Sequence, residues 1–415
     1  MTTPFFTLDL SVAERAARGL ASAAGPRTVV AYAVKVNPQP DLLATFSRSG
    51  LWAEVVSLRE LDLALRTGFP GAHVIVNGPA KGEDLLAAAV AAGATIHLES
   101  LRQVELLSRI GAAAAAVGLR IRVPCGPQSR FGIPLGDLSA ATDMLGDAGV
   151  TIAGLHAHFT PSLHGAAMED WECRARALRA AARHMKRAAA RHIKRAAASP
   201  LPTAAPRAGT AAVVPVPEPP PLRYLDWGGG LMAPDIDDPS AADFRRAAEP
   251  VMRFVEGETA AMARELDWPW VCAMVEPGRF LAEHAGSLKA TCLDAMTFGD
   301  RREFVLDAGI GLLAAHDSWL GCYKADSYRA GVQSGAYRVG GCGARGRDAS
   351  AAAKVTAEAD FAGPSCMEED VLPKRPVCGT PEVGGRVTLT RCGAYNLAGT
   401  TTFYHDPPSL HLVAS

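Results

Sequence analysis

The chain has 415 residues, a formal net charge of -1, 48% apolar residues and 20% charged residues. This is the composition of an ordinary soluble globular protein, large enough for a barrel plus a smaller domain, and it gives no reason to expect nucleic acid or a membrane as partner. The nine cysteines show no CxxC spacing, so we expect no zinc site and no disulfide framework. No apolar run reaches transmembrane length and the N-terminus lacks signal-peptide features, so we expect a cytoplasmic location.

Short apolar runs alternate with amphipathic stretches over the first 285 residues. This alternation predicts repeated βαβ units and a parallel sheet. The eight predicted strands suggest a (β/α)8 TIM barrel over residues 25–285. The predicted strands are 27–35, 51–56, 73–77, 94–98, 119–124, 151–158, 222–227 and 269–275, and the clearest predicted helices are 58–67, 81–92, 100–110 and 241–265.

The chain after residue 285 has a different pattern. Runs at 287–293, 303–307 and 384–390 are typical of strands joined by glycine-rich turns, without long helices between them. We predict a C-terminal all-β domain, like a β-sandwich or β-barrel, made of residues 286–415 together with 1–24. The segment 5–8 would add a strand to it.

One segment interrupts the barrel pattern. Residues 181–188 recur at 189–196 with a single change from Met to Ile, and a Pro/Ala-rich stretch follows at 199–221. We interpret residues 165–221 as an inserted basic helix with a flexible linker, between the sixth and seventh barrel strands. The alternative is a docking surface for an acidic carrier protein, although runs of charge usually form solvated faces.

Lys35 stands at the end of the apolar run 31–36, just before Asn37-Pro38. The run predicts a buried strand, where a lysine is rare because burial of its ammonium group is costly. A lysine held there can form a Schiff base with a carbonyl cofactor or substrate. The alternative is a lysine at a strand tip whose charge reaches water.

Three further groups follow barrel strands, and the C-terminal ends of barrel strands face the active site. Gly228, Gly229 and Gly230 follow the predicted seventh strand and would bring backbone N–H groups close to an anion. Glu276-Pro-Gly278-Arg279 follows the eighth, and His158 ends the sixth. A lysine, a phosphate cradle, an imidazole and a carboxylate together suggest pyridoxal 5'-phosphate as the cofactor, with no metal.

The motifs as a set resemble the fold-type III pyridoxal-phosphate-dependent decarboxylases, the group of diaminopimelate, ornithine and arginine decarboxylases. The resemblance covers nearly the whole chain apart from the insert and some loops. The motifs that carry it are Tyr32-Ala-Val-Lys35-Val-Asn37, Glu54-Val-Val-Ser57, Arg130-Phe-Gly132, Gly154-Leu-His-Ala-His158, Gly228-Gly-Gly230, Glu276-Pro-Gly-Arg279, Gly363-Pro-Ser-Cys366 and Gly393-Ala-Tyr395.

The resemblance implies an amino-acid α-decarboxylase that works as a homodimer with shared active sites. Lys35 would carry the cofactor and His158 would stack on its ring. Glu276 would pair with the pyridine nitrogen, and Glu54 would be the acidic residue near Lys35. Gly228 to Gly230, Gly278, Arg279 and Tyr395 would hold the phosphate. Cys366 would reach in from the second subunit and protonate the substrate, in a substrate site shared with Arg279, Met367 and Glu368.

Two departures from the family pattern bear on the substrate. The residue after the family cysteine is usually acidic in enzymes that bind a distal amino group, whereas here it is Met367, and a thioether cannot pair with an ammonium ion. Glu368 or Asp370 could substitute. In the loop after the sixth strand, Ser162 stands one position away from the usual phosphate-binding serine. We therefore expect a non-standard substrate: a diamino acid, an ω-modified amino acid or an amino acid on a larger scaffold.

Three alternatives stay open at this point. A racemase or epimerase would share the barrel and the cofactor but would need a second general base and would lack the Gly-Pro-Ser-Cys366 arrangement. A non-catalytic regulatory homologue would be expected to lose cofactor residues, which this chain retains. A small cofactor-carrier barrel is disfavoured by the length of the chain and its C-terminal β-domain.

Overall fold

The computed structural model describes residues 2–413, apart from 112–115, 125–128, 160–165, 199–221, 269–270, 300, 314–338, 342–356, 369, 379–380 and 401–405. The description therefore leaves out Ser162 and the Pro/Ala-rich stretch. None of the helices in the described residues is long and apolar enough to cross a membrane.

The first large unit is a closed barrel of eight parallel strands, as predicted. Each strand pairs with the next, and the last pairs with the first through Thr28 opposite Ala273. The strands are β2 (Thr28–Ala33), β3 (Trp52–Val55), β4 (Val74–Val76), β5 (Thr95–Leu98), β6 (Ala116–Arg120), β7 (Thr151–His156), β8 (Tyr224–Asp226) and β9 (Cys272–Val275).

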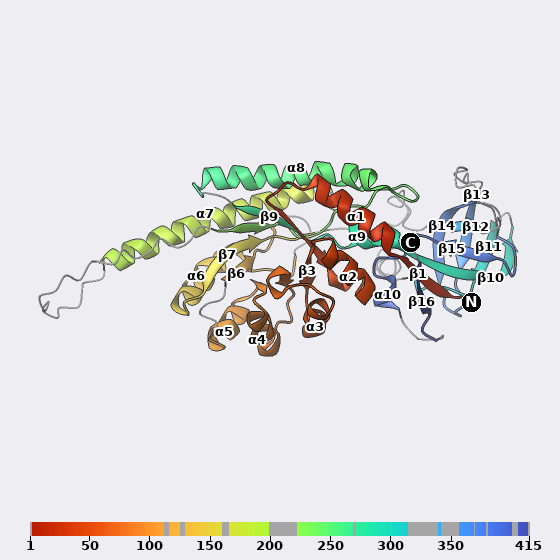
Figure 1. The fold of residues 1–415 in the computed structure, drawn as a ribbon, viewed down its shortest axis with the longest axis horizontal. Helices are drawn as coiled ribbons and strands as arrows, with labels where there is room; N and C mark the ends of the chain where they lie inside the picture. Colours follow the sequence, from red (N-terminus) through yellow and green to blue (C-terminus); the bar gives the residue numbers. More distant parts are fainter. Residues whose placement is uncertain are drawn as a thin grey trace, which may run out of the picture.

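Helices surround this barrel (Figure 1). Several begin where the sequence supplies a cap: Ser57 and Ser100 accept backbone N–H bonds from the third residue of their helices, and Ser240 forms a full capping box with Asp243. The helices are α1 (Leu10–Ala23), α2 (Pro40–Arg48), α3 (Leu58–Arg66), α4 (Glu83–Ala92), α5 (Leu101–Arg109), α6 (Leu138–Asp147), α7 (Met168–Ala198), α8 (Ala241–Glu265) and α9 (Arg279–Ala282).

The second unit is the predicted β-domain, at the right of Figure 1. Strand β10 pairs with both β15 and β11, which closes a ring of strands, and β1 and β16 extend the sheet beyond β10. Its elements are β1 (Phe5–Asp9), β10 (Gly286–Phe298), β11 (Arg301–Leu306), β12 (Val339–Gly341), β13 (Ala357–Ala362), β14 (Val371–Cys378), β15 (Arg386–Leu389), the short helix α10 (Asn396–Gly399) and β16 (Ser409–Val413).

The predicted boundary between the two units needs one correction. Residues 5–9 form a strand of the β-domain, but α1 packs along α8 and buries Ala13, Ala16 and Leu20 in the barrel core. The N-terminal part of the β-domain therefore ends at Asp9 and not at residue 24, because the apolar face of α1 is matched by a barrel helix.

The basic segment is helical, as predicted, but its first half belongs to the barrel. Trp171, Arg174 and Leu178 of α7 are fully buried. In the first copy of the repeat, Arg183 Nε lies 2.5 Å from Glu265 of α8 and Lys186 Nζ lies 2.7 Å from the Leu266 carbonyl. Arg183 and Lys186 of the first copy therefore already have partners within the chain. Beyond residue 187 the helix continues past the barrel (Figure 1).

The cysteines show one departure from the expected free thiols. Cys272, Cys292, Cys366 and Cys392 are free, whereas Cys173 on α7 is disulfide-bonded. A disulfide at Cys173 runs against the expectation of a reducing environment, and the cytoplasmic location stays a prediction.

Candidate active site

Lys35 lies at the mouth of the barrel, beside Glu54. The predicted strand 27–35 extends two residues too far at its C-terminal end: β2 ends at Ala33, and Val34–Val36 form a 3-10 turn. This turn is fixed from outside, because the Tyr395 N–H donates to the Val36 carbonyl at 2.7 Å. The Lys35 ammonium contacts Glu54 Oε2 on β3; the Lys35 side chain is 45% exposed to the open cavity, and Glu54 only 1%.

The pKa of Lys35 reflects two opposed effects. Desolvation at the barrel mouth lowers the pKa, but the charge and hydrogen bond of Glu54 oppose it and prevail, so the pKa lies above its ordinary value. Glu54 therefore holds the amine in its protonated form until the proton is taken away.

A cavity of about 420 Å³ opens at this end of the barrel. It brings together most of the residues singled out in the sequence, from seven different strands or loops. Its lining includes Lys35, Glu54, Arg120, Arg130, Phe131, His156, His158, Gly229, Gly230, Leu231, Glu276, Gly278, Arg279 and Tyr395.

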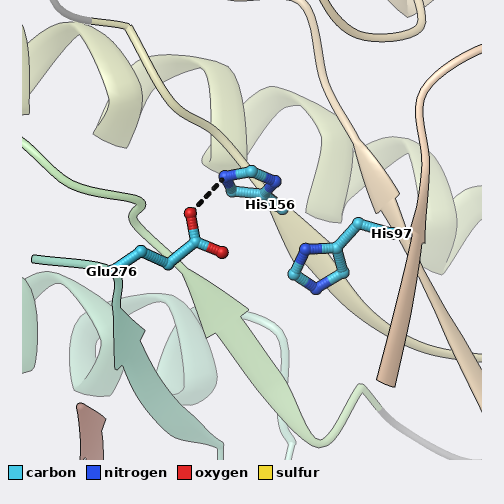
Figure 2. Close-up of side chains that lie close together, drawn as sticks. All are labelled: His97, His156 and Glu276. Carbon is cyan, nitrogen blue, oxygen red and sulfur yellow. Dashed lines mark ion pairs between the residues drawn. The ribbon is translucent and has the colours of Figure 1, made fainter. Parts of the chain in front are cut away.

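Glu276 lies at the floor of this cavity, at the end of β9. Its Oε1 accepts a hydrogen bond from Asn77 Nδ2 at 2.6 Å, and its Oε2 lies 3.5 Å from His156 Nε2 (Figure 2). Burial raises its pKa well above the usual range, and the nearby Asp226 and Glu54 carboxylates raise it further. This carboxyl therefore retains a proton readily and is suited to share one with a buried ring nitrogen.

His97, His156 and Glu276 offer atoms within 4.8 Å of one another, which is close enough for a metal ion. Both nitrogens of His97 are already engaged, with Asn77 Oδ1 at 2.8 Å and the Tyr224 hydroxyl at 3.1 Å. A metal would have to break one of these bonds, so we interpret the cluster as a hydrogen-bond network.

The glycine run forms a tight loop against His158. Gly228 has a φ of +67°, and a Cβ there would lie 2.6 Å from His158. A Cβ on Gly229 would lie 2.6 Å from the Glu276 carbonyl, and the Gly229 N–H donates to His158 Nδ1 at 3.1 Å. Only glycine permits this approach. The loop leaves the Gly229 and Gly230 backbone on the cavity wall.

His158 does not end a strand, since β7 stops at His156 and His158 follows two residues later. Burial lowers the pKa of its imidazole well below the usual range, and Arg174 lowers it further. Because Nδ1 accepts from Gly229, the neutral ring carries its proton on Nε2. A neutral, fixed ring on the cavity wall is suited to stack on a planar ligand.

Arg279 and Tyr395 meet on the cavity wall. The Arg279 guanidinium lies 5.3 Å from the centre of the Tyr395 ring, and its buried Nε has no hydrogen-bond partner among the described atoms. Gly278 packs so closely that a Cβ would lie 2.3 Å from Val36 Cγ2. Tyr395 comes from the β-domain, so residues of both units form this wall.

The remaining predicted residues lie elsewhere. Cys366, Met367 and Glu368 are exposed and do not line the cavity of their own chain. Asp370, one of two suggested substitutes for a missing acidic residue, is buried, and its carboxylate accepts from Ile310 N at 2.7 Å and Ser365 N at 3.0 Å. Asp370 shapes this loop and is not placed to bind a substrate ammonium group.

Several residues of the site were not predicted. Arg174 on α7 is fully buried and donates to the carbonyls of Phe159, Trp227 and Gly229, so it holds the two loops of the phosphate side together. Asn77, His97 and Tyr224 reach the site only because the barrel closes. Arg174 had one sequence signal, its position on the apolar face of a helix beside Trp171 and Leu178.

Asp226 gives a prediction for stability. It is buried beside Glu276, and burial raises its pKa from 3.8 to about 7, although a hydrogen bond from Gly228 N opposes the shift. Between these two values the folded protein binds more protons than the unfolded chain, so Asp226 lowers stability as pH rises through this window. Asp226→Asn keeps the acceptor for Gly228. We expect a melting temperature several degrees higher at pH 8, since about 1 kcal/mol moves it by roughly 2–4 °C in a large domain, and a clearly smaller rise at pH 5, which lies only about a third of the way through the window.

Differential scanning calorimetry at the two pH values measures this effect. Asp243→Asn is the matched control: its pKa is lowered by Ser240, so its change in melting temperature should be the same at pH 5 and pH 8. An equal shift for Asp226→Asn at both values would contradict the buried, protonated state.

The cavity fits pyridoxal phosphate on the evidence of its own atoms. The cavity is lined by the Lys35 amine, the buried Glu276 carboxyl, which retains a proton, and the neutral His158 imidazole. Its wall also includes the backbone of the glycine loop and Arg279, whose Nε has no hydrogen-bond partner among the described atoms. These groups match the aldehyde, the ring nitrogen, the ring face and the phosphate of that cofactor.

Known proteins agree with this geometry. Residues 11–195 match the family model described as pyridoxal-dependent decarboxylase, pyridoxal binding domain. The chain is 26% identical over 413 residues to the diaminopimelate decarboxylase of Zymomonas mobilis, covering 95% of this chain and 82% of that protein. It is 23% identical over 388 residues to the lysine/ornithine decarboxylase of Selenomonas ruminantium, covering 91% and 81%.

Solved structures give the same fold. The lysine/ornithine decarboxylase of Vibrio vulnificus has a TM-score of 0.68 at 18% identity, covering 99% of this chain and 94% of that one. The diaminopimelate decarboxylase of Helicobacter pylori also has a TM-score of 0.68, at 16% identity, covering 100% and 92%. The chain is therefore similar to pyridoxal-phosphate-dependent decarboxylases over its pyridoxal-binding domain, and it shares the fold of the solved lysine/ornithine and diaminopimelate decarboxylases.

Proposed function

We propose that this protein is a pyridoxal-phosphate-dependent carboxy-lyase that removes the α-carboxylate of an amino acid. The observation that carries the proposal is the cavity that joins Lys35, Glu276, His158 and the glycine loop in a chain with the pyridoxal-binding domain. The relatives named as diaminopimelate and lysine/ornithine decarboxylases support the same reaction.

Each residue has a distinct task in this proposal. Lys35 holds the cofactor through its amine, and Glu54 accepts the proton that the amine must lose. Arg279 and the Gly229–Gly230 backbone bind the phosphate, with Tyr395 and Gly278 shaping the wall. His158 packs on the ring and Glu276 holds the proton at the ring nitrogen. Bound pyridoxal phosphate supplies the electron sink that stabilises the charge left at the α-carbon when CO₂ departs.

The protein works as a homodimer in this proposal. Cys366 lies exposed on the β-domain and away from the cavity of its own chain, so it would protonate the α-carbon in the partner's site. A carrier protein at the basic repeat has weaker support, because Arg183 and Lys186 of the first copy are already bonded to Glu265 and Leu266.

The substrate is non-standard in this proposal. Met367 cannot pair with a distal ammonium group, and Asp370 is committed to backbone N–H groups. Of the two acidic substitutes suggested by the sequence, this leaves Glu368. The substrate classes are a diamino acid, an ω-modified amino acid and an amino acid on a larger scaffold.

A decarboxylation screen tests the function. The holoenzyme is incubated with L-, D- and carrier-linked amino acids, and mass spectrometry follows the loss of CO₂. We expect loss from at least one of them. Exchange of the α-proton for deuterium without CO₂ release from any would indicate a racemase and would overturn the decarboxylase.

Glu54 gives a prediction for cofactor capture. Glu54→Gln removes the effect that keeps the pKa of Lys35 high, so the neutral amine forms at lower pH. We expect the midpoint of the pH dependence of cofactor capture to fall by about one unit, the lower end of the shift that an adjacent opposite charge produces. Absorbance of the cofactor-free protein after mixing with pyridoxal phosphate measures the rate.

Glu60→Gln is the control. Its carboxylate accepts from Val56 N and makes no hydrogen bond to Lys35 in the described structure, so its midpoint should move much less. A capture rate for Glu54→Gln that is lower at every pH, with an unchanged midpoint, would show that Glu54 acts only as the proton acceptor.

A further inference from the structure

A chain of buried side chains leads from Glu276 and Asn77, which both line the cavity, to His97 and Tyr224, which do not. The Tyr224 hydroxyl lies 3.1 Å from His97 Nε2, His97 Nδ1 lies 2.8 Å from Asn77 Oδ1, and Asn77 Nδ2 lies 2.6 Å from Glu276 Oε1. Of these four residues, Tyr224 is 7% exposed, His97 0%, Asn77 3% and Glu276 6%. They come from four different barrel strands or the loops that follow them.

The direction of each bond in this chain is fixed. Asn77 uses its amide N–H groups toward Glu276, so its oxygen must accept from His97, and His97 must carry its proton on Nδ1. The bare Nε2 then accepts from the Tyr224 hydroxyl. Burial lowers the pKa of His97 to about 3 and raises that of Tyr224 above its ordinary value, so neither group changes charge near neutral pH.

Such a network is costly in a barrel core, because every buried polar group needs a partner. Apolar residues at positions 97 and 224 would fill the same space, as Ile75 and Met274 do in the apolar cluster to which the Tyr224 ring itself belongs. The chain of Tyr224, His97 and Asn77 ends on one oxygen of Glu276. The second oxygen faces His156, whose nitrogens have no hydrogen bond in the described structure.

We propose that Asn77, His97 and Tyr224 are positioning residues that fix the orientation of the Glu276 carboxyl toward the ring nitrogen of the cofactor. Asn77 holds one oxygen directly, His97 fixes the Asn77 amide, and Tyr224 fixes the His97 tautomer. The inference rests on the proposed pairing of Glu276 with that nitrogen. It is independent of whether the reaction is decarboxylation.

The test compares two ligands that differ at one atom: pyridoxal phosphate and its 1-carba analogue, in which carbon replaces the ring nitrogen. Equilibrium affinities of the cofactor-free protein are measured by fluorescence. We expect Asn77→Leu to weaken pyridoxal phosphate about tenfold, the loss expected for one hydrogen bond to a carboxyl, and to leave the analogue unchanged. Tyr224→Phe, which removes only the hydroxyl, should give a smaller loss of about threefold with the same selectivity.

Two variants make the result decisive. Gln103→Leu removes a buried amide that donates to the carbonyls of Gly78 and Pro79 and does not contact Glu276, so any loss should be equal for both ligands. Glu276→Ala should weaken pyridoxal phosphate and spare the analogue. If Glu276→Ala does not distinguish the ligands, the proposed pairing with the ring nitrogen fails. If it does, while Asn77→Leu and Tyr224→Phe weaken both ligands equally, the positioning chain is overturned.

The tautomer gives a second, independent readout. Nitrogen-15 spectra of histidine-labelled protein should show His97 protonated on Nδ1 and bare on Nε2. In Tyr224→Phe the Nε2 resonance should move, because it loses its donor. A His97 with its proton on Nε2 would contradict the direction of the chain.

Discussion

Replacing Lys35 with alanine should lower the rate of decarboxylation by at least roughly a thousandfold, because the amine that holds the cofactor is removed. The variant should also lose the long-wavelength absorbance of the bound cofactor. Stopped assays of CO₂ release and an absorbance spectrum measure both effects. Lys81 is a second candidate for the lysine that holds the cofactor. Burial lowers its pKa to about 8, whereas the pKa of Lys35 is raised above its ordinary value.

Geometry decides between the two lysines. Lys81 Nζ contacts the Gly78 carbonyl, lies 3.4 Å from Glu99 Oε1 and is fully buried, whereas Lys35 opens into the cavity. Lys81→Met should therefore keep the absorbance band. After borohydride reduction of the holoenzyme, the cofactor mass should be found on the peptide that contains Lys35. Label on the Lys81 peptide would refute the assignment, whatever the activities of the variants.

The barrel could be predicted because its signal is local. Runs such as 73–77 and 94–98 are apolar and short, and amphipathic helices such as 101–109 follow them, so period and length identify each element. Strand ends were predicted less well where tertiary contacts decide them. The Lys35 strand stops early because the Tyr395 N–H, from the distant β-domain, bonds to the Val36 carbonyl.

The residues of the candidate site also fall into two groups, those with a local signal in the sequence and those that only tertiary contacts bring to the site. Lys35, His158, Glu276 and the glycine loop stand in motifs whose residue types already indicate a cofactor. Asn77 and His97 stand in ordinary apolar surroundings, and nothing local distinguishes a buried asparagine in a network from one in a turn. Their role appears only when barrel closure brings residues 77, 97, 224 and 276 within hydrogen-bond distance.

The α1 error has a similar origin. An amphipathic helix does not reveal which unit its apolar face covers. Proximity in sequence to strand 5–9 suggested the β-domain, but the small residues Ala13, Ala16 and Ala17 permit close packing on α8. Gly19 shows how close that packing is, since a Cβ there would lie 2.5 Å from the Ala241 carbonyl.

Cys366→Ala should lower decarboxylation by about a hundredfold, the lower end of the contribution of a positioned general acid. Cofactor absorbance should be retained, because Cys366 does not line the cavity of its own chain. Val371→Ala is the matched control: Val371 is exposed on the same domain, does not line the cavity of its own chain, and the variant should keep most of the rate. Steady-state assays and absorbance spectra measure both variants.

If Cys366 acts in the partner's site, two inactive proteins should restore each other. Mixing Lys35→Ala with Cys366→Ala and allowing subunits to exchange gives mixed dimers in about half of the population, and each mixed dimer has one site with both native residues. We expect recovery to about a quarter of the native rate, rising with time as exchange proceeds. If Cys366 instead acted within its own chain, every site would lack one of the two residues, and mixing would restore nothing. The recovered fraction therefore tests the dimer and proton donation by the partner's Cys366 together. A sedimentation run that shows only monomer would exclude the dimer and with it proton donation across subunits.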